Sequence, residues 1–237
     1  MLKSQKMRTA TQYLVRPMRL ADVPQVVEIE RQSFPSMWPP TAFKRELQQN
    51  RIARYAVVVQ HNPSWTPSAQ PEPPGPPPER ESGRIGRIIG EIRQLLRPEA
   101  EAAALPPPEE RRELVLGFIG LWMLPDEAHI VTIAVRNSHR RRGIGESLLI
   151  SAIDESQRNG QGLMTLECRV TNEAALALYE KYAFEQVGMR PRYYSDNHED
   201  AYVLTVSSIT SEKYRNLFAR LRSDHTHRWG DFRTEFE

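Results

Sequence analysis

Apolar and polar positions along the chain follow two periodicities, one typical of strands and one typical of helices. Runs rich in apolar and β-branched residues predict strands at residues 13–19, 54–60, 114–123, 129–135, 163–170, 184–189 and 201–206. Apolar residues three or four positions apart predict helices that follow Asp22, Thr41, Gly145 and Asn172. Asp, Thr and Asn are residues that often cap helix N-termini. The order of these elements, without an internal repeat, predicts an α/β fold built on a mixed sheet.

The stretch at 130–159 joins an apolar strand to a basic glycine loop and a helix. Residues 130–135 have no polar face, as expected of a strand that is buried on both sides. The sequence RRRGIG follows at residues 140–145, and helical spacing begins at Leu148. Glycine lets the backbone approach a ligand closely, and the free amides at a helix N-terminus attract a phosphate group. This stretch therefore predicts a phosphate-binding loop.

Other interpretations of the glycine pair must be weighed against this one. A tight turn without a ligand has the same sequence signature, so the pair alone does not decide between them. The Walker phosphate loop is excluded, because Glu146 follows Gly145 where that motif needs Lys and then Ser or Thr. The Rossmann fingerprint fits poorly, because its third glycine would fall at Leu148.

A proline-rich insertion at 61–113 interrupts the predicted domain. Its prolines prevent a strand ladder or a continuous helix, so its first part predicts an extended linker. Residues 84–97 carry an apolar stripe at helical spacing among arginines, although Gly86 and Gly90 weaken a helix there. This amphipathic helix either packs back on the domain or binds a protein partner or an anionic membrane surface.

Composition restricts the class of protein. A hydrophobic content of 39% and 19 prolines indicate that part of the chain lies outside a packed core. The net charge of +2 argues against direct nucleic-acid binding, and the single cysteine excludes an internal disulfide or a cysteine zinc cluster. Neither a membrane-spanning run nor an apolar signal core is present, so we expect a cytoplasmic protein without a metal site.

Both ends of the chain are expected to lie outside a central domain at 13–206. Residues 1–12 predict a flexible tail. Residues 207–237 predict a C-terminal extension. Its short amphipathic helix runs through Tyr214, Phe218 and Leu221, and its polar remainder is expected to fray.

Alternation along the strand at 163–170 separates two candidate residues for chemistry. Cys168 faces the core and is not expected to act as a nucleophile. Glu167 faces the polar side together with Arg169. Glu167 is therefore a surface residue, an ion-pair partner of Arg169, or a carboxylate available for proton transfer.

Asn172 and Tyr179 lie two helical turns apart, and therefore along one face of the next helix. Taken alone, Asn172 could be a plain helix cap and Tyr179 a packing aromatic. Their spacing becomes informative only together with the sequence around them.

Two parts of the sequence resemble one known family. The pattern R-x-x-G-x-G after an apolar strand resembles the acetyl-CoA pyrophosphate loop of the GCN5-related N-acetyltransferases (GNAT). The run LECRVTNEAALALYEKYAFEQVGMRPRYYSDNHEDAYVL resembles the RimI-type ribosomal-protein-alanine N-acetyltransferases and is similar to the catalytic subunits of eukaryotic N-terminal acetyltransferases. The similarity is clear over 114–206 and weaker over 13–60. Cys168, Thr171 and the insertion depart from the family pattern, and the insertion leaves further partners open.

The resemblance implies a GNAT fold with a proline-rich insertion and acetyl-CoA as co-substrate. It implies direct acetyl transfer to the N-terminal α-amine of a protein, in particular a ribosomal protein with N-terminal alanine. It makes Glu167 the general base and Tyr179 the general acid. It assigns acetyl-CoA contacts to Ile133, Ala134, Val135, Arg140, Arg141, Arg142, Gly143, Ile144, Gly145, Glu146 and Asn172. It assigns contacts with the incoming peptide to Phe34, Trp38, Tyr193 and Tyr194.

Two other functions stay open on the sequence. An acetyltransferase for a small amine would have the same fold, but the Tyr193–Tyr194 segment resembles the peptide-binding type. An acyl-CoA-binding sensor or adaptor would use the 84–97 helix to bind a partner and would perform no chemistry. The presence of both Glu167 and Tyr179 argues against it, because a protein that only binds needs neither.

Overall fold

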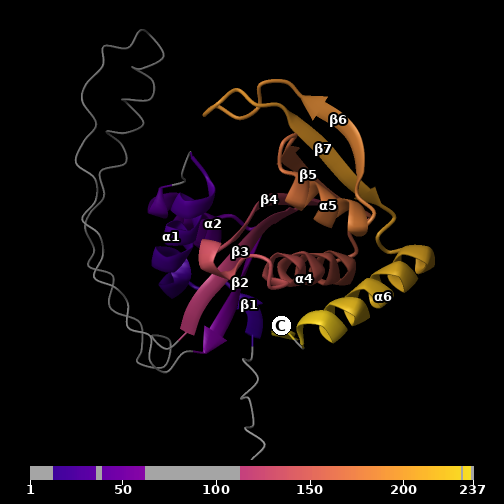
Figure 1. Ribbon diagram of the computed structural model, residues 1–237, viewed down its shortest axis with the longest axis horizontal. Coiled ribbons are helices and arrows are strands. Elements are labelled where there is room, and N and C mark those ends of the chain that lie inside the picture. Colours follow the sequence, from indigo (N-terminus) through magenta and orange to yellow (C-terminus); the bar gives the residue numbers. More distant parts are fainter. Residues whose placement is uncertain (1–12, 36–38, 62–112, 231, 236–237) are drawn as a thin grey trace, which may run out of the picture.

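The computed structural model describes residues 13–35, 39–61, 113–230 and 232–235 (Figure 1). They form an eight-stranded sheet in the order β6-β7-β5-β4-β3-β2-β1-β8. The strands are β1 (Tyr13–Pro17), β2 (Ala53–His61), β3 (Glu113–Met123), β4 (Glu127–Val135), β5 (Leu163–Arg169), β6 (Glu185–Arg190), β7 (Ala201–Ser207) and β8 (Phe232–Thr234). Only β4–β5 and β1–β8 pair in parallel, so the predicted mixed sheet is confirmed.

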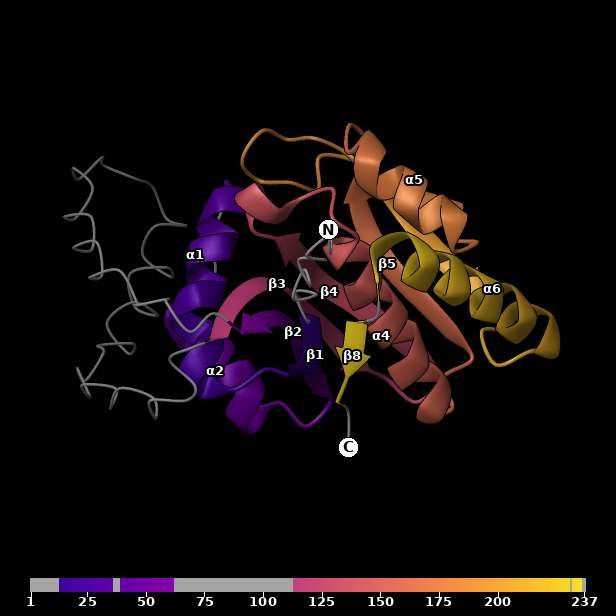
Figure 2. The same ribbon diagram turned by 60° about the horizontal axis from the view of Figure 1, so that its bottom comes forward.

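Helices cover both faces of the sheet (Figure 2). They are α1 (Val23–Ser33), α2 (Pro40–Gln49), α4 (Ile144–Arg158), α5 (Glu173–Lys181) and α6 (Glu212–Trp229), with short 3-10 turns η1 (Leu20–Asp22) and η3 (Asn137–His139). One apolar cluster joins α1 and α2 to the sheet through Val26, Ile29, Phe43, Val57 and Phe118. A larger cluster joins α4, α5 and α6 to the opposite face through Leu148, Ile153, Leu166, Tyr182 and Phe218. Burial of these side chains is the main force that holds the layers together.

The two central parallel strands separate before they end. β4 and β5 pair from Glu127↔Leu163 to Ile130↔Leu166, and in the described sheet their ladder stops there. β4 continues beside β3 as far as Val135, while β5 continues beside β7. The predicted burial of residues 130–135 on both faces is wrong in part. Ile130 and Ala134 are buried, but the other four are half-buried because β5 has turned away.

The helix starts differ in detail from the sequence prediction. Asn172 caps α5 as predicted, since its side-chain oxygen accepts the Ala175 amide at 3.3 Å. Asp22 precedes α1, but its carboxylate does not cap that helix and instead accepts bonds from the Arg16 guanidinium and the Arg19 amide. Thr41 is not the cap of α2, which begins one residue earlier at a proline suited to the first turn.

The C-terminal extension is more ordered than its sequence predicts. The expected fraying after Leu221 is wrong, because α6 continues to Trp229 and β8 then joins the sheet beside β1 (Figure 2). Ser211 caps α6 by accepting the Tyr214 amide at 3.2 Å. The extension thus crosses from the α5 side of the molecule to the β1 edge of the sheet.

Several predictions concern residues that the structure does not describe. The predicted tail at 1–12 and nearly all of the insertion at 61–113, including the 84–97 helix, lie outside the described residues. Within the described part of the chain, none of the helices combines the length and apolar character needed to cross a membrane.

Candidate active site

The glycine loop leads into the N-terminus of α4. Arg141 (φ 62°) and Gly143 (φ 77°) both have left-handed backbone conformations, which turn the chain sharply into the helix. The first helical hydrogen bond within α4 runs from the Ser147 amide to the Gly143 carbonyl at 2.9 Å. The amides of residues 144–146 precede this bond, so they are the free donors of a helix N-terminus and can bind an anion.

The three arginines of the loop are all exposed, but they and Glu146 differ in their contacts. Arg140 is an anchor, since it donates to the Ser33 hydroxyl at 3.1 Å and to the Val135 carbonyl at 3.2 Å. Arg141 and Arg142 are exposed. The Glu146 carboxylate points to α5, where it accepts bonds from Lys181 and Tyr182, so its charge is balanced away from the loop.

The predicted strand contacts Ile133, Ala134 and Val135 lie at the end of β4, where β5 no longer covers that strand edge. At the end of β4, Cγ2 of Val135 lies 3.5 Å from where a Cβ built on Gly145 would be. The structure thus brings the strand end and the glycine loop together, as the sequence predicts.

Glu167 is the first residue of β5 beyond the last pair with β4. Its side chain is 9% exposed, with Oε2 3.2 Å from His129 Nε2 and Oε1 2.8 Å from Arg190 Nε. The predicted pairing with Arg169 is wrong. Arg169 on the same strand face turns instead to Asp196, because partners on a neighbouring segment come closer than the next residue but one.

His129 was missed by the sequence prediction. It lies opposite Thr165 in the β4–β5 ladder, on the face that carries Glu167, and its ring lies 6.4 Å from that of Trp122. The signal that could have identified it was the register of the parallel pair, which places His129 opposite Thr165, two residues before Glu167 on the same strand face. The register depends on the three-dimensional pairing and cannot be read from one strand.

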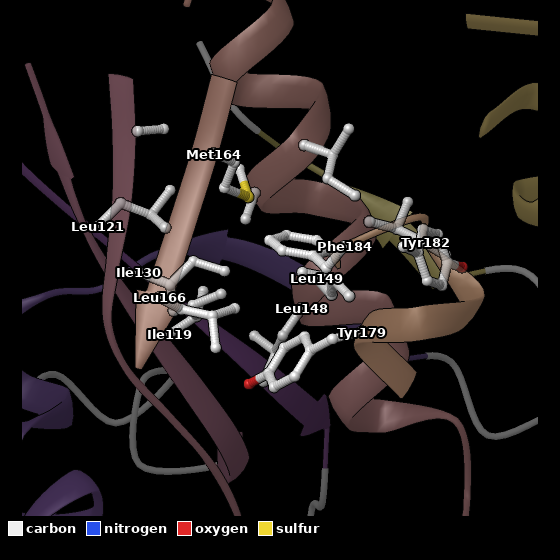
Figure 3. Close-up of a cluster of buried hydrophobic side chains, with 14 of the residues drawn as sticks. Ile119, Leu121, Ile130, Leu148, Leu149, Met164, Leu166, Tyr179, Tyr182 and Phe184 are labelled. Atoms are coloured by element: carbon white, nitrogen blue, oxygen red, sulfur yellow. The ribbon is translucent and has the colours of Figure 1, made fainter. Parts of the chain in front are cut away.

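Tyr179 lies on α5 and packs against the larger apolar cluster, with its hydroxyl turned toward the carboxyl end of β5 (Figure 3). The residue is 4% exposed. Burial raises the pKa of Tyr179 well above its ordinary value, and the nearby Cys168 and Tyr194 add to this effect. The side chain therefore keeps its proton at neutral pH.

Cys168 points into the core as predicted. It is 5% exposed, and burial raises the pKa of its thiol to about 11. A thiol that stays protonated is a poor nucleophile.

The loop between β6 and β7 carries the predicted tyrosine pair. The Arg169 guanidinium lies 3.7 Å from the centre of the Tyr194 ring, and Tyr193 packs edge-on against Tyr194 at 5.2 Å. Tyr193 is 48% exposed. In Figures 1 and 2 this loop reaches toward the end of α1, where half-buried Phe34 follows the helix. Trp38, the fourth predicted peptide contact, lies outside the described residues.

The chain is similar to known proteins in sequence and in fold. The sequence profile of the acetyltransferase (GNAT) family matches residues 23–184. A Bacillus subtilis (strain 168) protein, provisionally named a ribosomal protein bS18-alanine N-acetyltransferase, is 28% identical over 197 residues, which are 83% of this chain and 97% of that protein. The ribosomal protein bS18-alanine N-acetyltransferase of Escherichia coli (strain K12) is 40% identical over 83 residues, which are 34% of this chain and 56% of that protein.

Solved structures agree on the fold. The crystal structure of the ribosomal-protein-S18-alanine N-acetyltransferase from Escherichia coli superposes with a TM-score of 0.56 at 21% identity, over 83% of this chain and 94% of that one. At this identity the match concerns the fold alone. The family profile, however, spans the glycine loop, β5 and α5, so the resemblance seen in the sequence is confirmed: the chain belongs to the acetyltransferase (GNAT) family.

Proposed function

We propose that the protein transfers the acetyl group of acetyl-CoA to the N-terminal α-amine of a protein, and that its acceptor is a ribosomal protein with N-terminal alanine. The observation that carries this proposal is the position of Glu167, in contact with His129, at the point where β4 and β5 separate. The names of the relatives in Bacillus subtilis and Escherichia coli support the choice of acceptor.

The residues present fit acetyl-CoA. Free amides at the α4 N-terminus and the exposed guanidinium groups of Arg141 and Arg142 suit a pyrophosphate. The uncovered edge of β4 at residues 133–135 suits an extended, amide-containing arm, and Asn172 stands at the start of α5 on the other side. When bound, acetyl-CoA supplies an acetyl group activated as a thioester.

Glu167 is proposed to act as the general base. An α-amine has a pKa of about 7.7–8.0, so at neutral pH most of it carries a proton and is not nucleophilic. The Glu167 carboxylate and the His129 imidazole are in contact, so a proton taken from the amine can be held on either group. His129 is thereby added to the residues proposed to serve this reaction.

Two further groups of this chain serve the acyl transfer in the proposal. A backbone amide near the end of β4 is the simplest donor to the carbonyl oxygen on which charge develops. Tyr179 gives its proton to the departing sulfur, and its raised pKa ensures that this proton is present at neutral pH. Most of the rate then comes from holding the amine and the acyl donor in line.

The acceptor peptide is proposed to pass between the end of α1 and the β6–β7 loop. Phe34 lies on one side, and Tyr193 and Tyr194 on the other, with Trp38 as a further proposed contact. Exposed Tyr193 offers an aromatic surface to a peptide backbone, whereas a free small amine would need no such contact.

The proposal is tested by acetyl transfer from labelled acetyl-CoA to short peptides that differ in their first residue. We expect transfer to α-amines, best with alanine first, and none to lysine side chains or small amines. Preferred transfer to a small amine would replace the proposed acceptor. Binding of acetyl-CoA without transfer to any acceptor would favour a sensor or adaptor.

A Glu167→Gln variant tests the base. The amide keeps the size of the side chain but cannot take the proton, so kcat at pH 7 should fall by about 10²-fold or more. The deficit should shrink above about pH 9, where solvent has already deprotonated the amine. Undiminished turnover at neutral pH would remove Glu167 from this role, and an unchanged Kd for acetyl-CoA would show that the fold is intact.

A further inference from the structure

The C-terminal end of α6 touches the glycine loop. The His225 ring is 4% exposed, and its Nε2 lies 3.0 Å from the Gly143 carbonyl oxygen. A carbonyl only accepts hydrogen bonds, so Nε2 carries the proton and donates it to this oxygen. The same oxygen accepts the Ser147 amide, the first bond of α4. The hydrogen bond from His225 therefore holds Gly143, the residue that immediately precedes α4.

Trp229 packs against the same glycine. A Cβ built on Gly143 would lie 2.6 Å from Cγ and 2.7 Å from Cδ1 of the Trp229 indole. Real Cβ atoms do not approach so closely, so the indole lies directly on the Cα of Gly143. The φ of 77° also favours glycine at this position. The loop and α6 are therefore fitted to each other at one point.

Contacts at both ends of α6 hold the C-terminal extension in place. Near its start, the buried Tyr214 hydroxyl donates to the Tyr182 carbonyl at 3.1 Å. Beyond the C-terminal end of α6, β8 pairs with β1, and the Phe232 ring stacks on Tyr13 at 4.9 Å. Phe232 also lies 5.0 Å from the His225 ring, on which it packs. The contact on Gly143 therefore belongs to a braced segment and not to a loose tail.

We propose that α6 and β8 together form a clamp on the phosphate-binding loop, in which His225 and Trp229 are positioning residues for acetyl-CoA. The inference rests on the proposed function, because it takes the α4 N-terminus as the pyrophosphate site. By holding Gly143, the clamp keeps the amides of residues 144–146 in their binding arrangement before the ligand arrives. Less ordering is then needed on binding, which strengthens affinity.

The test compares three variants of the full chain by calorimetric titration with acetyl-CoA and by steady-state kinetics. His225→Ala removes the donor to Gly143. His225→Gln keeps an N–H that can reach the same carbonyl. Tyr214→Phe is the matched control, because it removes a buried hydrogen bond of the same helix at the end away from Gly143. Hydrogen exchange of the amides at 144–147 reports on the loop itself.

We expect His225→Ala to raise both the Kd and the KM for acetyl-CoA by about two- to tenfold, the range of one lost hydrogen bond, and to leave the KM for peptide unchanged. His225→Gln should restore most of the affinity, and Tyr214→Phe should lower the melting temperature without changing the Kd. Equal effects of His225→Ala and Tyr214→Phe on the Kd, or no effect of either, would overturn the clamp. Failure of the unaltered protein to bind acetyl-CoA would instead overturn the proposed function.

Discussion

Two features of Tyr179 bear on its proposed role. Its ring contributes to the core beside Phe184, and its hydroxyl is turned toward the carboxyl end of β5 (Figure 3). This position suits the proposed role of the hydroxyl as the proton donor.

A Tyr179→Phe variant separates packing from proton transfer. The ring and its contacts stay, so the protein should fold and bind acetyl-CoA normally, while kcat falls by about 10²-fold. The sign of the pH dependence follows from the raised pKa: the unaltered enzyme should keep its donor protonated beyond pH 10, the ordinary pKa of a tyrosine. Loss of kcat with a pKa below 10 that disappears in Tyr179→Phe would contradict this assignment.

The limits of sequence reasoning at this scale are set by contacts between strands. Strand alternation correctly placed Glu167 on a polar face and Cys168 in the core. It could not identify the partners of Glu167, because His129 and Arg190 come from β4 and β6 and meet the carboxylate only through the sheet. A period of two gives the face of a side chain and not its neighbours.

Among the elements, the β6–β7 loop is held by a group of charges centred on Arg169. Its guanidinium pairs with Asp196 at 2.7 Å and Glu199 at 3.0 Å, and it covers the Tyr194 ring. The Thr171 hydroxyl donates to Glu199 and is the main cause that lowers the pKa of this carboxyl to about 2. Because its pKa is lowered, the ionised Glu199 carboxylate stabilises the loop at pH values above the ordinary pKa of a glutamate. This stabilisation is lost only as the pH falls toward 2, so the loop stays in place at neutral pH.

An Arg169→Ala variant should release this loop. We expect the KM for peptide to rise about three- to tenfold, since charge-assisted hydrogen bonds that position the tyrosines are lost, with the KM for acetyl-CoA unchanged. Arg192→Ala, at an exposed arginine of the same loop, is the control for lost positive charge. An equal rise in both variants would show that the loop attracts the peptide by charge and not by order.

Element prediction succeeded where burial produces a clear period and failed where it does not. The strands and the first helices have apolar runs that follow one face of the sheet. In α6 the buried positions are Tyr214, Phe218 and His225, which do follow a helical period, but the last of these is polar. The three residues of β8 are too few to show any alternation. The clamp was therefore not predicted from the sequence, because the buried residue that forms it is a polar histidine, which is buried through its hydrogen bond to a backbone carbonyl.

At the scale of the whole molecule, residues 62–112 connect the end of β2 to the start of the neighbouring strand β3. β2 and β3 are antiparallel neighbours, and their last described pairs are Gln60↔Leu114 and His61↔Glu113. This end of the β2–β3 pair is stabilised by the buried Arg16. Its guanidinium lies 2.6 Å from the Glu113 carboxylate and 2.8 Å from that of Asp22. The strand pairing that flanks residues 62–112 is therefore formed entirely by described residues.

This geometry predicts that residues 62–112 can be replaced by a two-residue Asn-Gly turn. Cα atoms of directly paired antiparallel residues are about 5 Å apart, which such a turn spans. Shortening the connection lowers the entropy lost on closing it, so the variant should be as stable as the full chain or more stable by roughly 1–3 kcal/mol. Acetyl-CoA should bind with an unchanged Kd, because the contacts that place the end of β4 and the glycine loop against β3, among them the pair Gly117↔Val135 and the bond from the Arg136 amide to the Leu116 carbonyl at 2.8 Å, stay in the shortened chain.

Peptide acetylation by the shortened protein then decides what the insertion contributes. Retained transfer with the same preference for the first residue would place the whole reaction in the described domain and leave the insertion free for a partner. A Gly-Ser connection of the original length is the control for length alone. If both replacements bind acetyl-CoA but lose transfer, the insertion recognises the acceptor. If only the short turn loses transfer, the hairpin end must stay open for the peptide to approach.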